Sequence, residues 1–501
     1  MRNLLEAYGQ LNDEQRHAVD HGGNTAVLAG PGSGKTDTIV IKVAHLLLDH
    51  VRPPQGVACI TYGNDAVDEF TSRLRGFGVR SAPRLFLGTV HSFCLQRVLW
   101  PFATPARRPE LARPHIMSTR EQVRAMRAAI ETCGLTDNPD FFEPTLTRVR
   151  RAIACGEELS GIDDGYIAAA KEYRAGLLRL GAVDFEEMTL AALELMESHP
   201  AVSQILASRY PWLAVDEYQD LGGPLHKIVA LLERAGARIF AVGDPDQCIF
   251  GFTGASPHYL DELAVRADFE AVRLRFNYRS GAQIIAAAQA SLGEERDYVP
   301  RPDREDRGSI EAWEVQGEFE GQAKFIVEEL IPSLVSKGVR AEEIAILYKQ
   351  KGDFLDALQR AVPSSGVEYR IEKDARFPAA PIVRWLQRCA TRALGGAKED
   401  SLAALSSTFE RLLNGSGSSV DPLSARRLLL GALIGTSPEE PLNRWVDRFD
   451  RALGLAALCR VGPSPDDADA IDRLRADTES PTPLVEFARG VEIEGRVVVT
   501  T

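Results

Sequence analysis

A glycine-rich run near the start of the sequence has the residue types and spacing of a phosphate-binding loop. It lies between an apolar run and a stretch with helical periodicity, and it consists of Ala29, Gly30, Pro31, Gly32, Ser33, Gly34, Lys35 and Thr36. Glycines let backbone N–H groups curl around an anion at the N-terminus of a helix. In this pattern Lys35 suits the β- and γ-phosphates of a nucleotide, and the Thr36 hydroxyl suits Mg²⁺. A chance glycine-rich turn is the competing explanation, and the strand, loop and helix context disfavours it.

An acidic pair follows another apolar run. Asp216 and Glu217 come directly after residues 212–215 and open the sequence DEYQD. Nucleotide hydrolysis on a phosphate loop requires one carboxylate for Mg²⁺ and another group that orients or deprotonates the attacking water. Asp216 suits the first role and Glu217 the second. A solvated acidic turn is the ordinary explanation of such a pair, but it leaves the phosphate loop unexplained.

Short apolar runs alternate with helical stretches around these residues, which is typical of a parallel sheet with crossover helices. The expected strands of a first α/β domain are residues 25–30, 57–62, 212–217 and 238–244. The expected strands of a second α/β domain are 271–276, 309–315, 344–349, 369–371 and the last run, 495–501. Residues 96–181 and 380–485 have helical periodicity instead. The sequence therefore predicts two α/β domains, each interrupted by a helical insertion.

Further motifs accompany the loop and the acidic pair along the chain. They are LNDEQRHAV (11–19), TYGNDAVDEF (61–70), GTVHSF (88–93), DFEEM (184–188), VGDPDQCIFGFTGA (242–255), LRFNYRS (274–280) and EIAILYK (343–349). In composition and order these motifs resemble those of superfamily 1 DNA helicases of the UvrD/Rep type. The resemblance covers most of the chain and is weakest at 97–180 and 380–485.

This resemblance implies a fold class and a division into domains. The fold class is α/β, a P-loop NTPase with two RecA-like motor domains and two helical insertion subdomains. The first motor domain is expected at 1–95 and 181–270, around an insertion at 96–180, and the second at 271–378 and 486–501, around an insertion at 379–485. The resemblance also implies ATP and Mg²⁺ between the motors and 3′ to 5′ movement on single-stranded or partly duplex DNA.

Individual residues receive roles from the same resemblance. Gln15 is expected to read the adenine base, and Tyr278 to stack on it. Gln247 is expected to sense the γ-phosphate and Arg279 to act as an arginine finger, roles that suit an amide and a guanidinium. Contacts to single-stranded DNA are expected from Thr61, Tyr62, Asn64, Thr89, His91, Phe250 and Phe252. The aromatic residues among them suit base stacking, which tolerates any sequence.

The chain departs from the family pattern at several positions and at its end. Asp37 stands where many relatives carry a basic residue, and Thr253 and Lys349 stand where arginine is usual. The last run, GRVVVTT, resembles the start of the next motif without its His and Lys-Gly residues or the later second arginine finger. An apolar last strand should have little cover, so we expect a longer native chain or a completing protein partner. Residues 1–501 alone are expected to bind Mg-ATP, but to turn it over slowly and not to unwind DNA.

Composition limits the class of protein further. The 501 residues suffice for three or four compact units, and the fractions of apolar (45%) and charged (26%) residues are ordinary for globular proteins. The net charge of −13 means that any DNA binding must come from a local groove. The 7 cysteines are scattered without a CxxC pair, which disfavours a metal site. The sequence has no signal peptide or membrane-spanning run, so we expect a cytoplasmic protein without membrane contact.

Two other classes of protein fit part of the pattern. One is a regulatory subunit that binds ATP and DNA for a partner nuclease and does not unwind, an alternative that the missing second finger favours. No nuclease motif is present in the sequence, so cutting would require that partner. The other is a phosphate-loop kinase acting on small molecules, which the motifs at 216–220 and 242–255 disfavour. Stimulation of ATP hydrolysis by single-stranded DNA distinguishes the helicase from the kinase, and strand displacement distinguishes it from the regulatory subunit.

Overall fold

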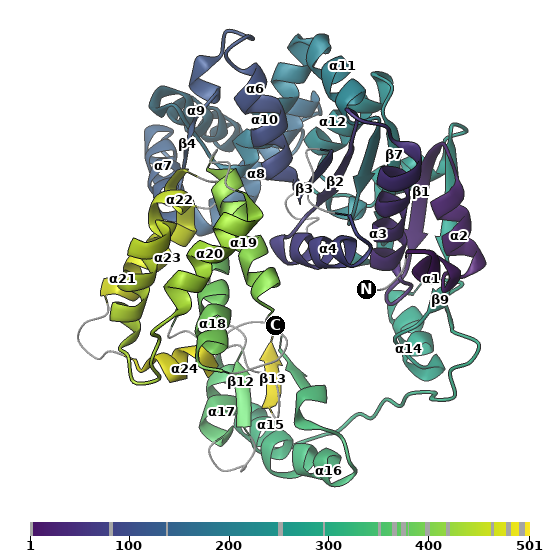
Figure 1. Cartoon of the computed structure of the whole chain (residues 1–501), viewed down its shortest axis with the longest axis vertical. Helices are drawn as coiled ribbons and strands as arrows, with labels where there is room; N and C mark the ends of the chain where they lie inside the picture. Colours follow the sequence, from purple (N-terminus) through teal and green to yellow (C-terminus); the bar gives the residue numbers. More distant parts are fainter. Residues whose placement is uncertain are drawn as a thin grey trace. The chain divides into compact units, whose positions relative to one another are not determined.

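The computed structural model contains two compact units, Met1–Ile310 and Glu311–Thr501 (Figure 1). The residues it describes are 4–79, 84–136, 139–248, 254–293, 296–348, 352–362, 368–371, 377–378, 380–395, 401–416, 421–461, 465–476, 482–489 and 496–500. Among these residues, no helix is both long and apolar enough to cross a membrane.

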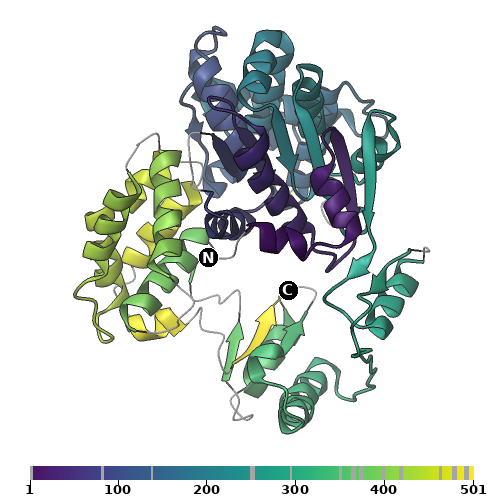
Figure 2. The same cartoon turned by 45° about the vertical axis from the view of Figure 1, so that its right-hand side comes forward.

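A six-stranded sheet forms the centre of the first unit, and every neighbouring pair of its strands is parallel (Figure 2). In spatial order its strands are β3 (Leu85–Thr89), β2 (Val57–Thr61), β6 (Trp212–Val215), β7 (Arg238–Gly243), β1 (Asn24–Ala29) and β8 (Phe269–Leu274). Because the strands are parallel, their carboxyl ends meet at one edge of the sheet. The order differs from the order along the chain, so this edge brings together residues that are far apart in sequence.

Both faces of this sheet are buried, which explains why its strands are continuous apolar runs. Alternate residues of β2 point to opposite faces: Ala58 and Ile60 belong to one core, and Val57 and Cys59 to the other. Helices α10 (Phe185–Ser198), α12 (Gly223–Arg234) and α13 (His258–Val265) cover the first face. Helices α3 (Lys35–His45) and α4 (Asn64–Gly76) cover the second. Further α-helices of this unit are α1 (Leu4–Gly9), α2 (Asp13–Asp20), α5 (Val90–Phe93), α6 (Trp100–Phe102) and α11 (Pro200–Arg209).

The segment expected as a helical insertion is helical and has a core of its own. Its main helices are α7 (Thr119–Thr132), α8 (Pro139–Cys155) and α9 (Asp164–Leu180), flanked by the short paired strands β4 (His115–Ile116) and β5 (Ala182–Val183). Ser118 and Glu121 form a capping box at the start of α7. Gly181 ends α9 in the left-handed conformation (φ 60°), where glycine costs least. The helices thus carry local start and stop signals that agree with their packing.

One strand expected in the second sheet belongs to the first. The run 271–276, expected to open the second sheet, contributes β8, which pairs with β1 in the first sheet. A short β9 (Phe276–Asn277), helix α14 (Ala282–Leu292) and β10 (Val299–Pro300) follow within the same unit. The strand expected at 309–315 is wrong, because these residues form neither strand nor helix. Apolar periodicity shows that a segment suits a strand, but it does not identify the partner strand.

The second unit contains a small parallel sheet whose central strand is the last run of the sequence. β13 (Arg496–Thr500) lies between β11 (Ala345–Leu347) and β12 (Glu368–Ile371), and Val497 and Val499 are fully buried. The expectation that this run has little cover is therefore wrong. The accompanying helices are α15 (Glu318–Phe325), α16 (Ile331–Ser336) and α17 (Asp353–Ala361).

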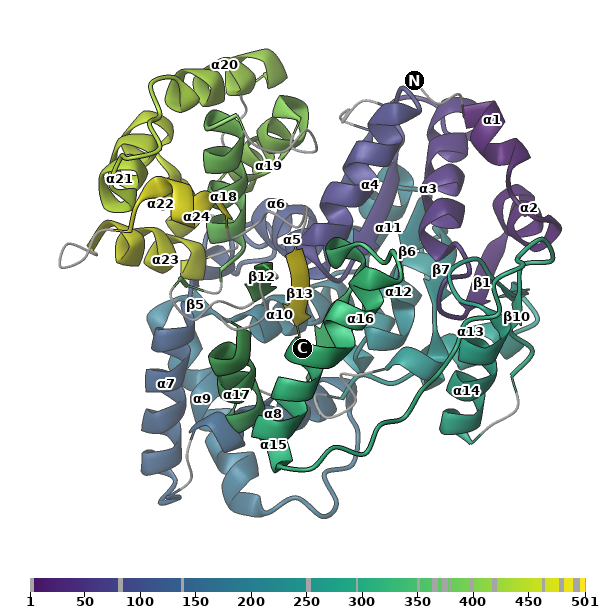
Figure 3. The same ribbon diagram turned by 90° about the horizontal axis from the view of Figure 1, so that it is seen from below.

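A helical bundle forms the rest of the second unit, as expected for residues 379–485 (Figure 3). Its helices are α18 (Pro381–Ala393), α19 (Leu402–Gly415), α20 (Pro422–Leu433), α21 (Leu442–Leu453), α22 (Leu455–Val461), α23 (Pro465–Ala476) and α24 (Leu484–Arg489). The core is mainly aliphatic and also contains aromatic side chains, of which Trp445 and Phe449 stack with ring centroids 4.6 Å apart. The four-part division into two motors and two insertions remains a prediction.

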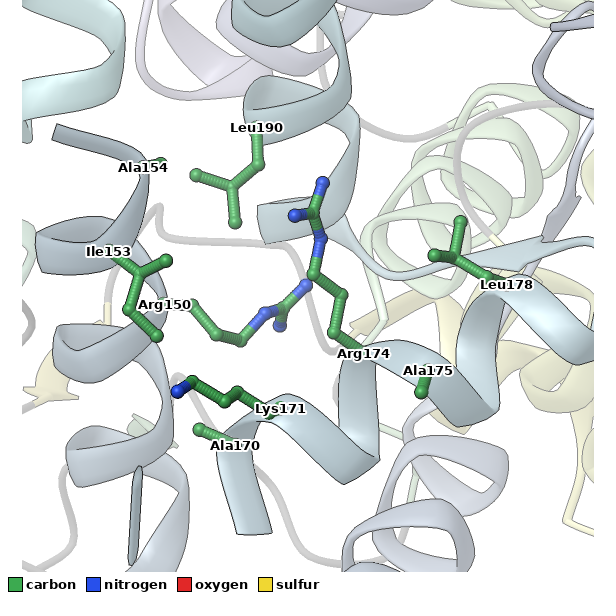
Figure 4. A pocket seen from close by; sticks show the side chains of 9 residues that line it. All are labelled: Arg150, Ile153, Ala154, Ala170, Lys171, Arg174, Ala175, Leu178 and Leu190. Atoms are coloured by element: carbon green, nitrogen blue, oxygen red, sulfur yellow. The ribbon is translucent and has the colours of Figure 1, made fainter. Parts of the chain in front are cut away.

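A buried ion network connects the helical insertion to the sheet-covering helix α10. Arg150 of α8 donates to both carboxylate oxygens of Asp184 (2.7 and 3.0 Å) and to Glu187 (2.9 Å). Arg174 of α9 also binds Glu187, and both arginines line a pocket of about 270 Å³ between α8, α9 and α10 (Figure 4). Burial favours a raised pKa for Asp184, but the charge and hydrogen bonds of Arg150 outweigh it and lower the pKa. The carboxylate therefore stays ionised in the folded protein.

We predict that Arg150→Met lowers the free energy of unfolding by about 3–5 kcal/mol, because it leaves the buried Asp184 carboxylate without its arginine and leaves Glu187 with Arg174 alone. The matched control is Arg179→Met, which removes an arginine whose pair with Glu172 is exposed and should change stability by no more than about 1 kcal/mol. Urea unfolding of the full chain, followed by tryptophan fluorescence, measures both. Equal effects of the two substitutions would contradict a stabilising role for the network.

Candidate functional site

The carboxyl edge of the first sheet gathers most of the residues that the sequence identified. Thr61 ends β2 and Thr89 ends β3, and they are directly paired neighbours in the parallel ladder. Asp216 follows β6, and its N–H donates to Ile60 of β2 (2.9 Å). The phosphate loop follows β1 at the same edge. The strand order thus places the acidic pair between the loop and the two threonines.

The loop between β1 and α3 has the curled backbone of an anion site. Gly32 and Gly34 both adopt positive φ values (67° and 81°), which glycine adopts without strain. The Ser33 N–H and hydroxyl both donate to the Gly30 carbonyl (3.3 and 2.7 Å), which closes the turn. Lys35 and Thr36 open α3, so the N–H groups of the first helical turn and the positive end of the helix dipole are available to phosphate.

Carboxylates surround the Lys35 ammonium. Its Nζ lies 3.7 Å from Glu217 and 3.8 Å from Asp244, the acid directly after β7. Burial, followed by the charge of Glu217, raises the pKa of Asp216 to about 7. The buried Oδ2 of Asp244 has no hydrogen-bond partner in the described part of the chain. The single positive charge of Lys35 does not balance the carboxylates of Asp216, Glu217 and Asp244. Carboxylate oxygens are ligands that suit Mg²⁺.

Gln219 is a site residue that the sequence analysis missed. Its side chain is almost fully buried, and its Nε2 donates to the Glu217 carboxylate (2.8 Å). Its Oε1 accepts the N–H of Asp244 (2.9 Å). Gln219 therefore holds the ends of β6 and β7 together and orients Glu217, whose own backbone is left-handed (φ 49°). The DEYQD sequence contains this residue, but only the adjacency of β6 and β7 reveals its role.

Gln15 is buried beside the loop and is engaged within the chain. Its Nε2 donates to the Ser33 carbonyl (2.9 Å), and its Oε1 accepts the N–H of Asn12 in a capping box at the start of α2. Any contact with adenine must therefore use the remaining amide hydrogen or lone pair. The loop position of Gln15 is consistent with the expected role, which remains a prediction.

The segment after β8 lies directly on the phosphate loop. Tyr278 donates its N–H to the Gly32 carbonyl (2.7 Å), and its hydroxyl accepts a hydrogen bond from Asn12 (2.9 Å). A side chain at Gly32 would collide with Asn277 and with the Cβ of Arg279, each 2.7 Å from its Cβ position. The Arg279 side chain is exposed and forms no hydrogen bond or ion pair with the residues that the structure describes. Gln247 is exposed in the short 3₁₀ turn η5 (Pro245–Gln247).

Five of the expected DNA contacts, Thr61, Tyr62, Asn64, Thr89 and His91, are described by the structure and lie at or near the ends of β2 and β3. Thr61 is buried and its hydroxyl has no hydrogen-bond partner among the described residues, whereas Thr89 caps α5 through the Ser92 N–H. His91 lies against Phe185, with ring centroids 5.1 Å apart, and its pKa is lowered by burial. Tyr62 and Asn64 are exposed at the start of α4. Phe250 and Phe252 lie outside the described residues, as do Thr253 and Lys349.

Two arginines add charge contacts that the motifs did not predict. Arg151 of α8 binds both carboxylate oxygens of Glu186 (2.9 and 2.7 Å) and lies against Gly222 and Gly254. It thus connects the helical insertion to α10 and to the backbone at Gly222 and Gly254. Arg73 of α4 forms an ion pair (2.5 Å) with Asp37, the acidic residue noted as a departure. The changed charge at this position therefore has a partner within the chain.

A parallel sheet with this loop and acidic pair defines the class of protein as a P-loop NTPase with an α/β fold. The family model described as the UvrD/REP helicase N-terminal domain matches residues 11–268. The chain belongs to the UvrD/REP helicase family, and the resemblance inferred from its motifs is confirmed.

Similar curated proteins carry helicase names. DNA helicase II of Escherichia coli (strain K12) is 28% identical over 381 residues, which cover 73% of this chain and 52% of the relative. The ATP-dependent DNA helicase PcrA of Bacillus subtilis (strain 168) is 25% identical over 391 residues, which cover 73% of this chain and 51% of the relative. The ATP-dependent DNA helicase UvrD2 of Mycobacterium tuberculosis (strain ATCC 25618 / H37Rv) is 27% identical over 401 residues, which cover 73% of this chain and 56% of the relative. The chain spans about half the length of the curated relatives it matches.

We predict that Gln219→Ala lowers the free energy of unfolding by about 1–3 kcal/mol, because it leaves the buried N–H of Asp244 without an acceptor. Gln55→Ala is the matched control, since the Gln55 side chain also hydrogen-bonds a backbone group, the Ser208 carbonyl to which it donates, but does so at the exposed surface. Chemical unfolding of the two variants measures the difference. A loss at Gln219 no larger than the loss at Gln55 would show that the bridge between β6 and β7 is dispensable.

Proposed function

We propose that this chain is the motor part of an ATP-dependent DNA helicase or translocase that couples ATP hydrolysis to 3′ to 5′ movement on single-stranded DNA. The observation that carries the proposal is the approach of the Lys35 ammonium to within 4 Å of both Glu217 and Asp244. This contact unites the phosphate loop with carboxylates from two further strands. Family membership supports the same activity, and the names of the relatives describe ATP-dependent DNA helicases.

The residues at the loop divide the work of ATP hydrolysis. Lys35 and the N–H groups at the start of α3 bind the β- and γ-phosphates, while Thr36 and Asp216 are suited to hold Mg²⁺. When bound, Mg²⁺ neutralises phosphate charge. Glu217, oriented by Gln219, accepts a proton from the attacking water. Gln247 and Arg279 supply further hydrogen bonds and charge at the γ-phosphate.

We assign DNA binding to the carboxyl ends of β2 and β3, at the same edge of the first sheet as the ATP site. Thr61 and Thr89 offer hydroxyl groups at neighbouring strand ends, and Asn64 and His91 add polar groups for the backbone of a single strand. Tyr62 offers an exposed aromatic ring, 37% accessible, on which a base can stack. The ATP site and the DNA contacts lie on one sheet. A displacement of the phosphate loop or of the acidic pair would therefore be transmitted to the DNA contacts through the paired ends of β6 and β2.

We predict that Lys35→Ala lowers the rate of ATP hydrolysis by at least about 10²–10³-fold, the loss typical of removing one positioned charge at a developing anion. Lys337→Ala is the control, since Lys337 is an exposed lysine of the second unit. Phosphate release, measured with and without single-stranded DNA, tests both variants. Hydrolysis at the unmodified rate in Lys35→Ala would refute the assignment of the ATP site.

We predict that Tyr62→Ala weakens binding of an oligothymidine strand by roughly 5–150-fold, equivalent to the 1–3 kcal/mol of one stacked base. Tyr62→Phe keeps the ring and should retain most of the affinity. Fluorescence anisotropy measures DNA binding, and binding of a fluorescent ATP analogue should be equal in all three proteins. Unchanged DNA affinity in Tyr62→Ala would remove Tyr62 from the DNA path.

A further inference from the structure

Asp246, next to the expected γ-phosphate sensor Gln247, is clamped by an arginine from a distant segment. Arg296 donates from Nε to both carboxylate oxygens (3.1 and 2.9 Å) and from its terminal nitrogen to one of them (2.6 Å). Side-chain hydrogen bonds from Arg296 lower the pKa of Asp246. Only 9% of the Asp246 side chain is exposed, so water screens this pair weakly. Such a forked contact fixes orientation as well as distance.

Tyr298 connects the same carboxylate to the phosphate loop. Its hydroxyl donates to Asp246 Oδ2 (3.3 Å). Its ring lies so close to Gly30 that the Cβ of any other residue there would be 2.5 Å from a ring carbon. Gly30 is therefore required for this close approach. The ring thus contacts the loop at one end while its hydroxyl holds the Gln247 turn at the other.

The segment that carries Arg296 and Tyr298 also carries the expected arginine finger. β10 pairs in parallel with β9, and Tyr278 and Arg279 directly follow β9. Gln289 of α14 donates to the carbonyls of Arg296 and Tyr298 (2.9 and 3.1 Å), which fixes this stretch against the helix. Arg279, Arg296 and Tyr298 therefore belong to one packed segment, the β9–α14–β10 unit.

The Gln247 turn is supported from the opposite side as well. Gln219 accepts the N–H of Asp244, and Asp244 in turn accepts the N–H groups of Asp246 (3.1 Å, at Oδ1) and Gln247 (3.0 Å, at its carbonyl). One side of the turn is thus connected to Glu217 through Gln219, and the other to Arg279 through Arg296. Neither Arg296 nor Tyr298 belongs to the motifs that identified the site.

We propose that Arg296, Asp246 and Tyr298 form a positioning cluster that aligns the Gln247 turn and the phosphate loop with Arg279. In this arrangement the side chains of Gln247 and Arg279 both reach the γ-phosphate. The proposal rests on the proposed function, because it concerns the same nucleotide site. Arg296 and Tyr298 are positioning residues, acting through Asp246 and Gly30. The cluster should matter for a nucleotide with a γ-phosphate and have little effect on one without it.

The test compares the affinities of the full chain for ADP and for a non-hydrolysable ATP analogue with Mg²⁺, by isothermal titration calorimetry. In Arg296→Ala, ADP affinity should stay within about twofold, while the preference for the ATP analogue over ADP should fall by about tenfold, the order of one charge-assisted hydrogen bond. Arg296→Lys, which cannot form the fork, should lose part of that preference. Exchanging the charges, Asp246→Arg with Arg296→Asp, should restore part of the preference that Arg296→Ala loses.

The matched control is Arg301→Ala, five residues further on, because Arg301 pairs at the surface with Asp303 and should leave both affinities unchanged. Tyr298→Phe keeps the ring on Gly30 and removes only the hydroxyl, which provides a milder variant if Arg296→Ala does not fold. If Arg296→Ala and Tyr298→Phe keep the preference for the ATP analogue over ADP unchanged, the proposed cluster is wrong, while the proposed function is not affected. Equal losses of ADP and analogue affinity would also overturn the cluster, since they indicate general damage. If the unmodified chain binds neither nucleotide, the proposed function fails, and the cluster with it.

Discussion

The parallel hydrogen-bonded ladder of the first unit is the constraint on which the site depends. Parallel strands connected by crossover helices all end at the same edge of the sheet, so every loop that follows a strand reaches the same surface. The direct pairing of β6 with β2 and β7 places the acidic pair between the threonines of one half and the phosphate loop of the other. A different strand order with the same sequence motifs would separate these groups.

Charge balance is the second constraint at this edge. The Glu217 and Asp244 carboxylates approach one ammonium, and burial raises the pKa of Asp216 to about 7, so keeping all three carboxylates ionised costs free energy. Gln219 keeps Glu217 and Asp244 in place despite their mutual repulsion. The same charges that cost stability are those that the proposed ATP hydrolysis uses, which is a common property of functional sites.

Ion pairs connect the insertion and the β9–α14–β10 unit to the sheet. Arg150 and Arg151 join α8 to the segment at 184–187, and Arg296 joins β10 to the turn after β7. Buried ion pairs contribute little net stability, but removing one partner is costly, so they penalise alternative arrangements. The elements around the nucleotide site are thus held in one arrangement by charge as well as by apolar packing.

The sequence by itself determined the phosphate loop and the acidic pair, because each consists of contiguous residues of recognisable type and spacing. It also determined the strands β1, β2, β6 and β7 and the helical character of both insertions, because these follow from the pattern of apolar residues along a contiguous segment. Tertiary structure decided which strands pair. Residues 271–274 joined the first sheet, residues 309–315 formed no strand, and the last run became a central strand. Gln219, Arg151 and Arg296 became site residues only because strands and helices distant in sequence became neighbours. Pairing and side-chain contact are long-range interactions, and no local pattern of residue types specifies the partner.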